Sequence, residues 1–154
     1  MNASVTPLPF SAIALVLAGI ILMGLGLYFV LLRPPLLPED LRYMGASLSE
    51  IQVHVPRLLL WLRRVMWVTG GHAVATGLLT IWVAVTTFRA RAKGAAGVVA
   101  VAGIASIGWM TIVNFIIDSD FKWLILVFVL PWVLALALYY AESSGKHLGH
   151  EHGG

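Results

Sequence analysis

The chain has 154 residues, of which 60% are hydrophobic and only 11% charged, and its mean hydropathy is +0.92. Soluble domains carry about 25% charged residues, so this composition excludes a soluble globular protein. The net charge of +3 is interpreted as arginines flanking membrane helices, with no nucleic-acid partner, and the lack of cysteine excludes disulfides and thiolate sites.

The charged residues leave four uncharged windows, at about 8–32, 65–88, 94–117 and 123–141. Each window suits a helix that crosses a hydrocarbon core about 30 Å thick. The sequence therefore predicts an all-α polytopic membrane protein, a single domain over 1–154 with four transmembrane helices in an up-down bundle. The predicted helices lie at about 8–32, 57–90, 94–117 and 122–141.

The first apolar run is too long for a cleaved signal peptide and is expected to remain as a helix. Arg33-Pro34-Pro35 should end it, because proline lacks an amide donor. In the connection that follows, Pro38 favours a short helix start, and Ser47 with Glu50 forms a capping box. The segment at about 38–56 is predicted to be amphipathic and to lie on the membrane surface between helices 1 and 2.

The second helix carries His72, the one charged or imidazole side chain within any of the four apolar runs. Glycines in the first and second helices, among them Gly19, Gly26, Gly70 and Gly77, favour close helix packing. The third helix is expected to end with polar residues on one face, and Pro131 is expected to kink the fourth. The tail at 142–154 is predicted to be mobile.

A polar cluster is predicted if the second and third helices are antiparallel neighbours, since several polar side chains then share a depth. A polar side chain in lipid normally faces a partner or a cavity, which makes the cluster a candidate ligand-binding site. The alternative, to which we give more weight, is that the histidine only hydrogen-bonds across a helix pair. No catalytic arrangement is found. The candidate residues are His72, Thr69, Thr111, Asn114, Asp118 and Arg64.

Three weaker hypotheses concern cofactors, metal and lipid. His72 could be an axial ligand of a haem or pigment, although a second intramembrane histidine is missing and no cofactor is expected. A divalent metal could bind the tail histidines, against the alternative of a solvated tail. Anionic headgroups could bind arginines near the start of the second helix, against simple snorkelling. The residues concerned are His147, His150 and His152 for metal, and Arg57, Arg63 and Arg64 for lipid.

In size and topology the chain is similar to the four-helix glutathione and eicosanoid membrane enzymes. Those families place Arg, Asn and Glu together on the second helix, whereas this helix offers Arg63, Arg64 and His72. The resemblance is therefore one of architecture. Small multidrug transporters differ as well, because their first helix carries a glutamate and this one has no charge.

The leading functional hypothesis is a small structural or accessory subunit, acting through helix packing as a homo-oligomer or within a larger complex of the bacterial cytoplasmic membrane. The alternatives are binding or transport of a lipid-like or small amphipathic ligand and, third, a glutathione-type membrane enzyme. The positive-inside rule favours termini outside, because the 33–64 loop is rich in arginine. The basic turn at 89–93 and the acidic turn at 118–120 argue for the reverse.

Overall fold

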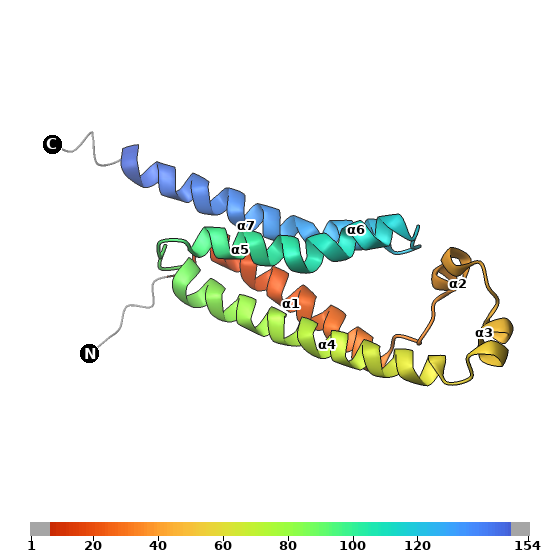
Figure 1. The fold of residues 1–154 in the computed structure, drawn as a ribbon. Coiled ribbons are helices and arrows are strands. Elements are labelled where there is room, and N and C mark those ends of the chain that lie inside the picture. The colour runs from red at the N-terminus through yellow and green to blue at the C-terminus, as the bar shows by residue number, and fades with distance from the viewer. Residues whose placement is uncertain (1–6, 149–154) are drawn as a thin grey trace.

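The computed structural model describes the chain from residue 7 to residue 148, and the side chains from 7 to 144. This part of the chain is helical and contains no strand (Figure 1). Four helical stretches are long and apolar enough to cross a membrane, which confirms the predicted fold class. The elements are α1 (Phe10–Leu31), α2 (Pro38–Met44), α3 (Leu48–His54), α4 (Leu58–Val83), the π-helical turn η1 (Ala84–Phe88), α5 (Ala95–Gly103), the π-helical turn η2 (Ile104–Gly108), α6 (Trp109–Ile116) and α7 (Lys122–Leu148).

The connection between α1 and α4 folds as the local sequence predicts. Helix α2 has Pro38 in its first turn and ends at Gly45, whose φ of +66° suits a residue without a Cβ. Helix α3 begins with the predicted capping box: the amide of Glu50 donates to the Ser47 side chain, and the amide of Ser47 donates to Glu50 Oε2 at 2.7 Å. These two caps divide the connection into two short helices.

Helices α1 and α4 pack through reciprocal pairs of glycines. A Cβ built on Gly26 would lie 2.6 Å from the carbonyl oxygen of Gly70, and one built on Gly70 would lie 2.6 Å from that of Gly26. Gly19 and Gly77 are paired in the same way, at 2.8 and 2.5 Å. The paired glycines are seven residues apart on each helix, so the contact repeats with the heptad period that keeps two helices facing each other.

Helix α7 packs against α1, and α5 and α6 pack against α7. A Cβ on Gly103 of α5 would lie 2.7 Å from Cε3 of Trp132, so the indole of α7 rests directly on the α5 backbone. Helix α6 also packs against α7. The order across the molecule is therefore α4, α1, α7 and then α5 with α6. The second and third spans meet mainly where η1 contacts α5, so the condition on which the predicted polar cluster depends, side-by-side packing of these two spans, is not met.

The core is concentrated at the end of the bundle where α1 begins and α7 ends. Its members include Leu15, Phe88, Val99, Trp132 and Tyr139, contributed by all four spans. Toward the opposite end, the α1–α4 pair and the α6–α7 pair diverge, and α2 and α3 lie between their ends (Figure 1). We call this opposite end the loop end.

The end of the fourth span differs from the sequence prediction. Helix α7 continues past Ala141 as far as Leu148, so the first part of the predicted tail is helical. Its Glu142 is held by hydrogen bonds from the amide and the hydroxyl of Ser11, at 3.1 and 2.7 Å, and by an ion pair with Arg91. These contacts anchor the end of α7 against the start of α1. Helix α7 also continues through Pro131 without a break.

Candidate functional site

The polar residues predicted on the second span lie on the outside of α4. His72 is exposed, and its Nδ1 is 2.8 Å from the carbonyl oxygen of Val68 one turn earlier. Thr69 is also exposed and donates to the carbonyl oxygen of Val65 at 2.9 Å. Both side chains therefore hydrogen-bond within their own helix, and neither reaches α6.

The predicted residues of the third span, Thr111 and Asn114, lie on α6, which packs against α7 and not against α4. Thr111 is buried and donates to the carbonyl oxygen of Ile107 at 2.8 Å, while Asn114 Nδ2 donates to that of Met110 at 2.8 Å. The structure therefore does not bring the six predicted residues together, because α4 packs on α1 while α6 packs on α7. A ligand-binding role for any one of them stays a prediction.

The two predicted residues at the mouth of the cluster are also separate. The Arg64 guanidinium lies 4.3 Å from the ring centroid of Trp67 on α4, a cation–π contact on the same helix. Asp118 lies in the turn after α6 with a φ of +51° and forms an ion pair with Lys122. The hydrogen bond from Lys122, followed by its charge, lowers the pKa of Asp118.

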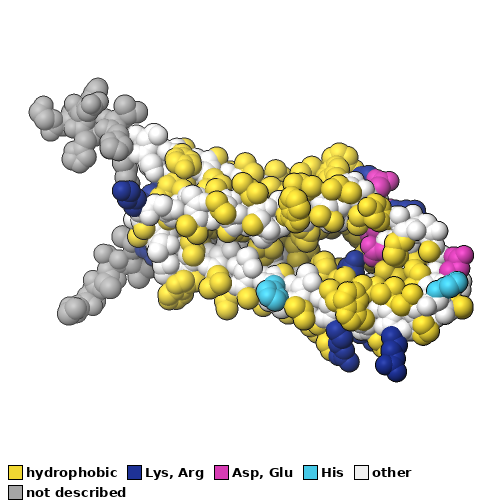
Figure 2. All heavy atoms as spheres, in the orientation of Figure 1, with side chains coloured by type: hydrophobic (Ala, Val, Ile, Leu, Met, Phe, Trp, Pro, Cys, Tyr) yellow, Lys and Arg dark blue, Asp and Glu magenta, His cyan; other side chains and the backbone are white. Residues whose placement is uncertain are grey.

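The predicted lipid-binding arginines, Arg57, Arg63 and Arg64, are exposed at and just after the start of α4. Figure 2 shows basic side chains projecting from this edge of the molecule near the loop end. Their headgroup-binding role stays a prediction. Of the predicted metal ligands, His150 and His152 lie outside the described residues, as does the side chain of His147.

A polar cluster that the sequence analysis did not identify joins α2 to the turn between α6 and α7. Ser119 donates to Glu39 Oε1 at 3.1 Å and accepts from the amide of Phe121 at 3.1 Å. Arg42 forms an ion pair with Asp120 at 2.7 Å. We call this the loop-end cluster; its charged and hydroxyl members are Arg33, Glu39, Asp40, Arg42, Asp118, Ser119, Asp120 and Lys122.

The same cluster also fixes α2 to the other half of the bundle. Arg33, just after α1, forms an ion pair with Asp40 at 3.2 Å and donates to Met66 Sδ of α4 at 3.1 Å. Its guanidinium also lies 5.3 Å from the centroid of the Phe29 ring. Helix α2 therefore bridges the two diverging helix pairs. Figure 2 shows an opening through the molecule beside this bridge, with acidic and basic side-chain atoms at its edge.

One local signal in the sequence bears on this cluster. Pro38-Glu39-Asp40 opens a helix, and acidic residues in a first turn are usual because they face the positive end of the helix dipole. That reading accounts for Asp40, which accepts from the amide of Leu37 at 2.8 Å. It does not account for Glu39, which is only 1% exposed, since its burial depends on a turn about eighty residues further along the chain.

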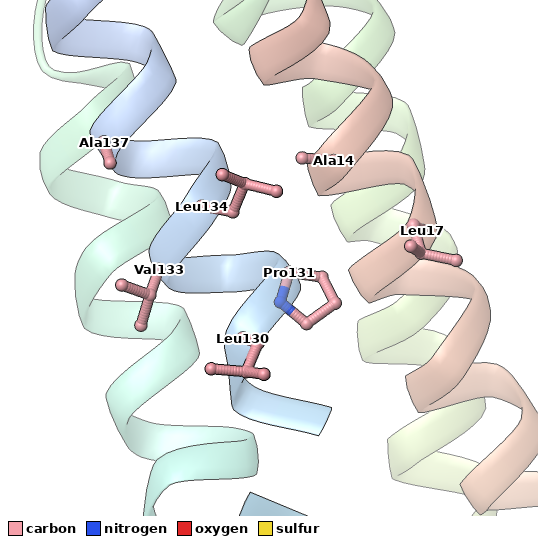
Figure 3. A pocket seen from close by; sticks show the side chains of 7 residues that line it. All are labelled: Ala14, Leu17, Leu130, Pro131, Val133, Leu134 and Ala137. Carbon is pink, nitrogen blue, oxygen red and sulfur yellow. The ribbon is translucent and has the colours of Figure 1, made fainter. Parts of the chain in front are cut away.

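A second feature is an apolar groove between α1 and α7, with a volume of about 440 Å³. Figure 3 shows Pro131 and Leu134 of α7 reaching toward α1, where Ala14 faces them. The small side chain of Ala14 and the proline ring leave room that a larger pair would fill. The lining residues are Ala14, Leu17, Leu130, Pro131, Val133, Leu134 and Ala137.

Comparison of the chain with protein-family models, with curated proteins and with solved structures found no match in any of the three.

Proposed function

We propose that this small integral membrane protein is a structural or accessory subunit that associates with further membrane helices through the outer face of α4. The outer α4 face is defined by residues that recur at helical spacing and are all exposed in the single chain. They are Val68, Gly71, His72, Ala75, Leu79 and Trp82.

The observation that carries this proposal is the position of His72. It lies eight residues from Arg64, about 12 Å along the helix axis, and so well inside the apolar span. Its Nδ1 bonds to the carbonyl oxygen of Val68, while Nε2 has no hydrogen bond to any described residue. A polar nitrogen facing lipid is costly, and a partner helix that offers a hydrogen-bonding group removes that cost.

The residues beside His72 suit the approach of such a helix. Gly71 and Ala75 are four residues apart on the same face, the small-xxx-small spacing at which membrane helices come close together. A Cβ built on Gly71 would meet nothing within 4 Å, so this position is open within the single chain. The larger Leu79 and Trp82, 63% and 66% exposed, extend the same face toward the other membrane surface.

Cysteine cross-linking in native membranes tests the proposal, since the chain has no cysteine of its own. We expect Ala75→Cys to form a cross-linked dimer, or a cross-linked adduct with another membrane protein that mass spectrometry then identifies. Val101→Cys on α5 is the matched control, because Val101 is 67% exposed and belongs to a different helix. Replacing the imidazole by His72→Leu in the Ala75→Cys background should reduce the cross-link.

The proposal fails if Ala75→Cys yields only uncross-linked monomer in native membranes, or if its cross-linking equals that of Val101→Cys. Loss of the cross-link on Ala75→Cys/Gly71→Leu would support it further, because a large side chain at Gly71 would hold a partner helix away.

The location and orientation of the chain are also part of the proposal: the bacterial cytoplasmic membrane, with the termini outside. The arginines of the 33–64 loop support this orientation through the positive-inside rule. A cysteine at exposed Val53 of α3 should then react with a membrane-impermeant thiol reagent only after the cells are lysed. Labelling in intact cells would instead indicate the opposite orientation, with the termini inside.

A lipid-like ligand is the second candidate, and the apolar groove between α1 and α7 favours it. A volume of about 440 Å³ lies within the range of known ligand sites, and the lining is apolar. Ala14→Phe should fill the groove and reduce the acyl-chain lipid that co-purifies with the protein, as measured by native mass spectrometry. Unchanged lipid retention would argue against this second function.

A further inference from the structure

Glu39 is the buried carboxylate that the fold leaves incompletely paired. The residue is 1% exposed, and Oε1 accepts one hydrogen bond, from Ser119. Oε2 is buried and has no hydrogen-bond partner among the described residues. A buried carboxylate oxygen without a donor is costly, and native proteins usually supply one from a side chain, the backbone, water or a ligand.

The charges around Glu39 do not provide that donor. Each of the three cations in the loop-end cluster forms its ion pair with another acid: Arg33 with Asp40, Arg42 with Asp120 and Lys122 with Asp118. Glu39 contributes to the raised pKa of the Arg42 guanidinium, but Asp120 dominates that effect. The guanidinium donates its hydrogen bonds to Asp120 and to the carbonyl oxygen of Asp118, and none to Glu39. Four acidic side chains in this cluster face three basic ones, and Glu39 is the acid that has no ion pair.

The position of Glu39 suits a ligand that comes from the membrane surface. Helix α2 lies at the level where α1 has just ended and α7 begins, beside the opening visible in Figure 2. Oε2 itself is covered in this structure, so access of a ligand requires a shift of α2. The ion pair that fastens α2 to the α6–α7 turn, Arg42 with Asp120, is more than half exposed and so resists such a shift only weakly.

The chemistry of the site selects the kind of cation. Divalent metals need several oxygen or nitrogen ligands, and no group of three or more His, Asp or Glu residues able to hold one occurs among the described residues. One carboxylate oxygen beside a hydroxyl instead matches a single N–H donor that carries a positive charge. A quaternary ammonium supplies the charge but no N–H, so it cannot satisfy Oε2.

We propose that Glu39 Oε2, held in place through Ser119, binds a protonated primary amine at the loop end of the bundle. The ammonium group supplies both the missing positive charge and the missing hydrogen bond. Two sources share this chemistry: the ethanolamine headgroup of a phospholipid, and a small amphipathic amine that enters from the membrane surface. The inference is independent of the association of α4 with partner helices, which concerns the opposite side of the α1–α4 pair.

Native mass spectrometry of the full chain released from mixed micelles tests this site with matched probes. The first pair is phosphatidylethanolamine against phosphatidylcholine of the same acyl chains, and the second is dodecylamine against dodecyltrimethylammonium. We expect the primary amine to be retained about tenfold over its quaternary analogue, the ratio that one hydrogen bond to a charged group produces. Preference within the first pair identifies a lipid source, and preference within the second pair alone identifies a small amphiphile.

Glu39→Gln should abolish the preference, because the amide removes the charge and keeps the shape. Glu50→Gln is the control: it is the same substitution on the same connection, at an exposed position, and it should leave the preference unchanged. The proposal is overturned if neither pair of probes shows a preference in the wild-type protein, or if the preference survives in Glu39→Gln. If Glu39→Gln does not fold, the wild-type comparison of the two pairs decides alone.

Discussion

Replacing Gly26 by alanine tests whether the glycine pairs hold α1 and α4 together. The new Cβ would lie 2.6 Å from the carbonyl oxygen of Gly70 and 2.7 Å from the amide nitrogen of Val74, and both obstacles are backbone atoms. Ordinary contact begins at 3.4 Å, so the helices must separate locally by the difference of 0.8 Å. Overpacking of this kind costs about 1–3 kcal/mol, and we expect the upper part of that range because no flexible side chain can move away.

Gly24→Ala is the matched control. Gly24 lies on the same helix, and a Cβ there would meet nothing within 4 Å. Both substitutions gain the same helix propensity, about 1 kcal/mol in water, so this gain cancels when the two variants are compared. The difference in their unfolding free energies therefore measures the steric cost at the α1–α4 contact.

The assay is unfolding by sodium dodecyl sulfate in mixed micelles, followed by the fluorescence of the six tryptophans. Gly26→Ala should unfold at lower detergent fraction than Gly24→Ala, by the equivalent of about 2–3 kcal/mol. Adding Gly70→Ala to Gly26→Ala should cost less than its single effect, because the helices have already moved apart. Equal stabilities of Gly26→Ala and Gly24→Ala would refute the packing that we describe.

Two further predictions concern polar contacts. Glu142→Gln should lower the unfolding free energy in the same assay by about 1–3 kcal/mol, because Arg91 loses its carboxylate partner. The hydroxyl and amide of Ser11 keep an acceptor in this variant. An unchanged unfolding free energy would show that the ion pair does not hold the end of α7. The hydrogen bonds from Ser47 lower the pKa of Glu50 below its ordinary value of 4.5. The stability that this pair adds to α3 is therefore present above that pH and is lost as the pH falls through the lowered pKa. The protection of amides at the start of α3, measured as hydrogen exchange relative to the intrinsic rate at each pH, should therefore fall at acid pH in the wild type. It should be insensitive to pH over that window in Glu50→Gln, and equal protection profiles would contradict the capping role.

The small residues of α1 and α4 also explain why the bundle is asymmetric. The register of the glycine pairs continues one heptad further, to Ala12 and Ala84, both fully buried. Small residues at each step let α4 approach α1 closely, and α4 packs mainly on α1, whereas α1 also packs on α7. Helix α4 therefore leaves most of its surface, including His72, free of contact with the rest of the described chain. The same close pairing carries the loop end of α4 away from α6 and leaves α2 to bridge the gap.

Much of the local structure was predictable because its causes are local. The apolar windows set the four spans, since a helix satisfies its own backbone hydrogen bonds and its length is set by the thickness of the membrane. The capping box at Ser47 and Glu50 involves residues three positions apart, so it could be recognised without knowing the fold. The glycines of α1 and α4 were correctly associated with close packing, although their pairing was not specified.

The choice of neighbours was decided only by the tertiary structure. Four apolar helices can be arranged in several orders with similar burial, and the heptad register of Gly19 and Gly26 against Gly77 and Gly70 selects α1 as the partner of α4. That choice separates His72 from Asn114 and so disperses the predicted polar cluster. The same arrangement buries Glu39 against Ser119. These two residues are far apart in the chain, so no local sequence pattern predicts their contact. Sequence alone determined what crosses the membrane, whereas packing determined which polar groups meet.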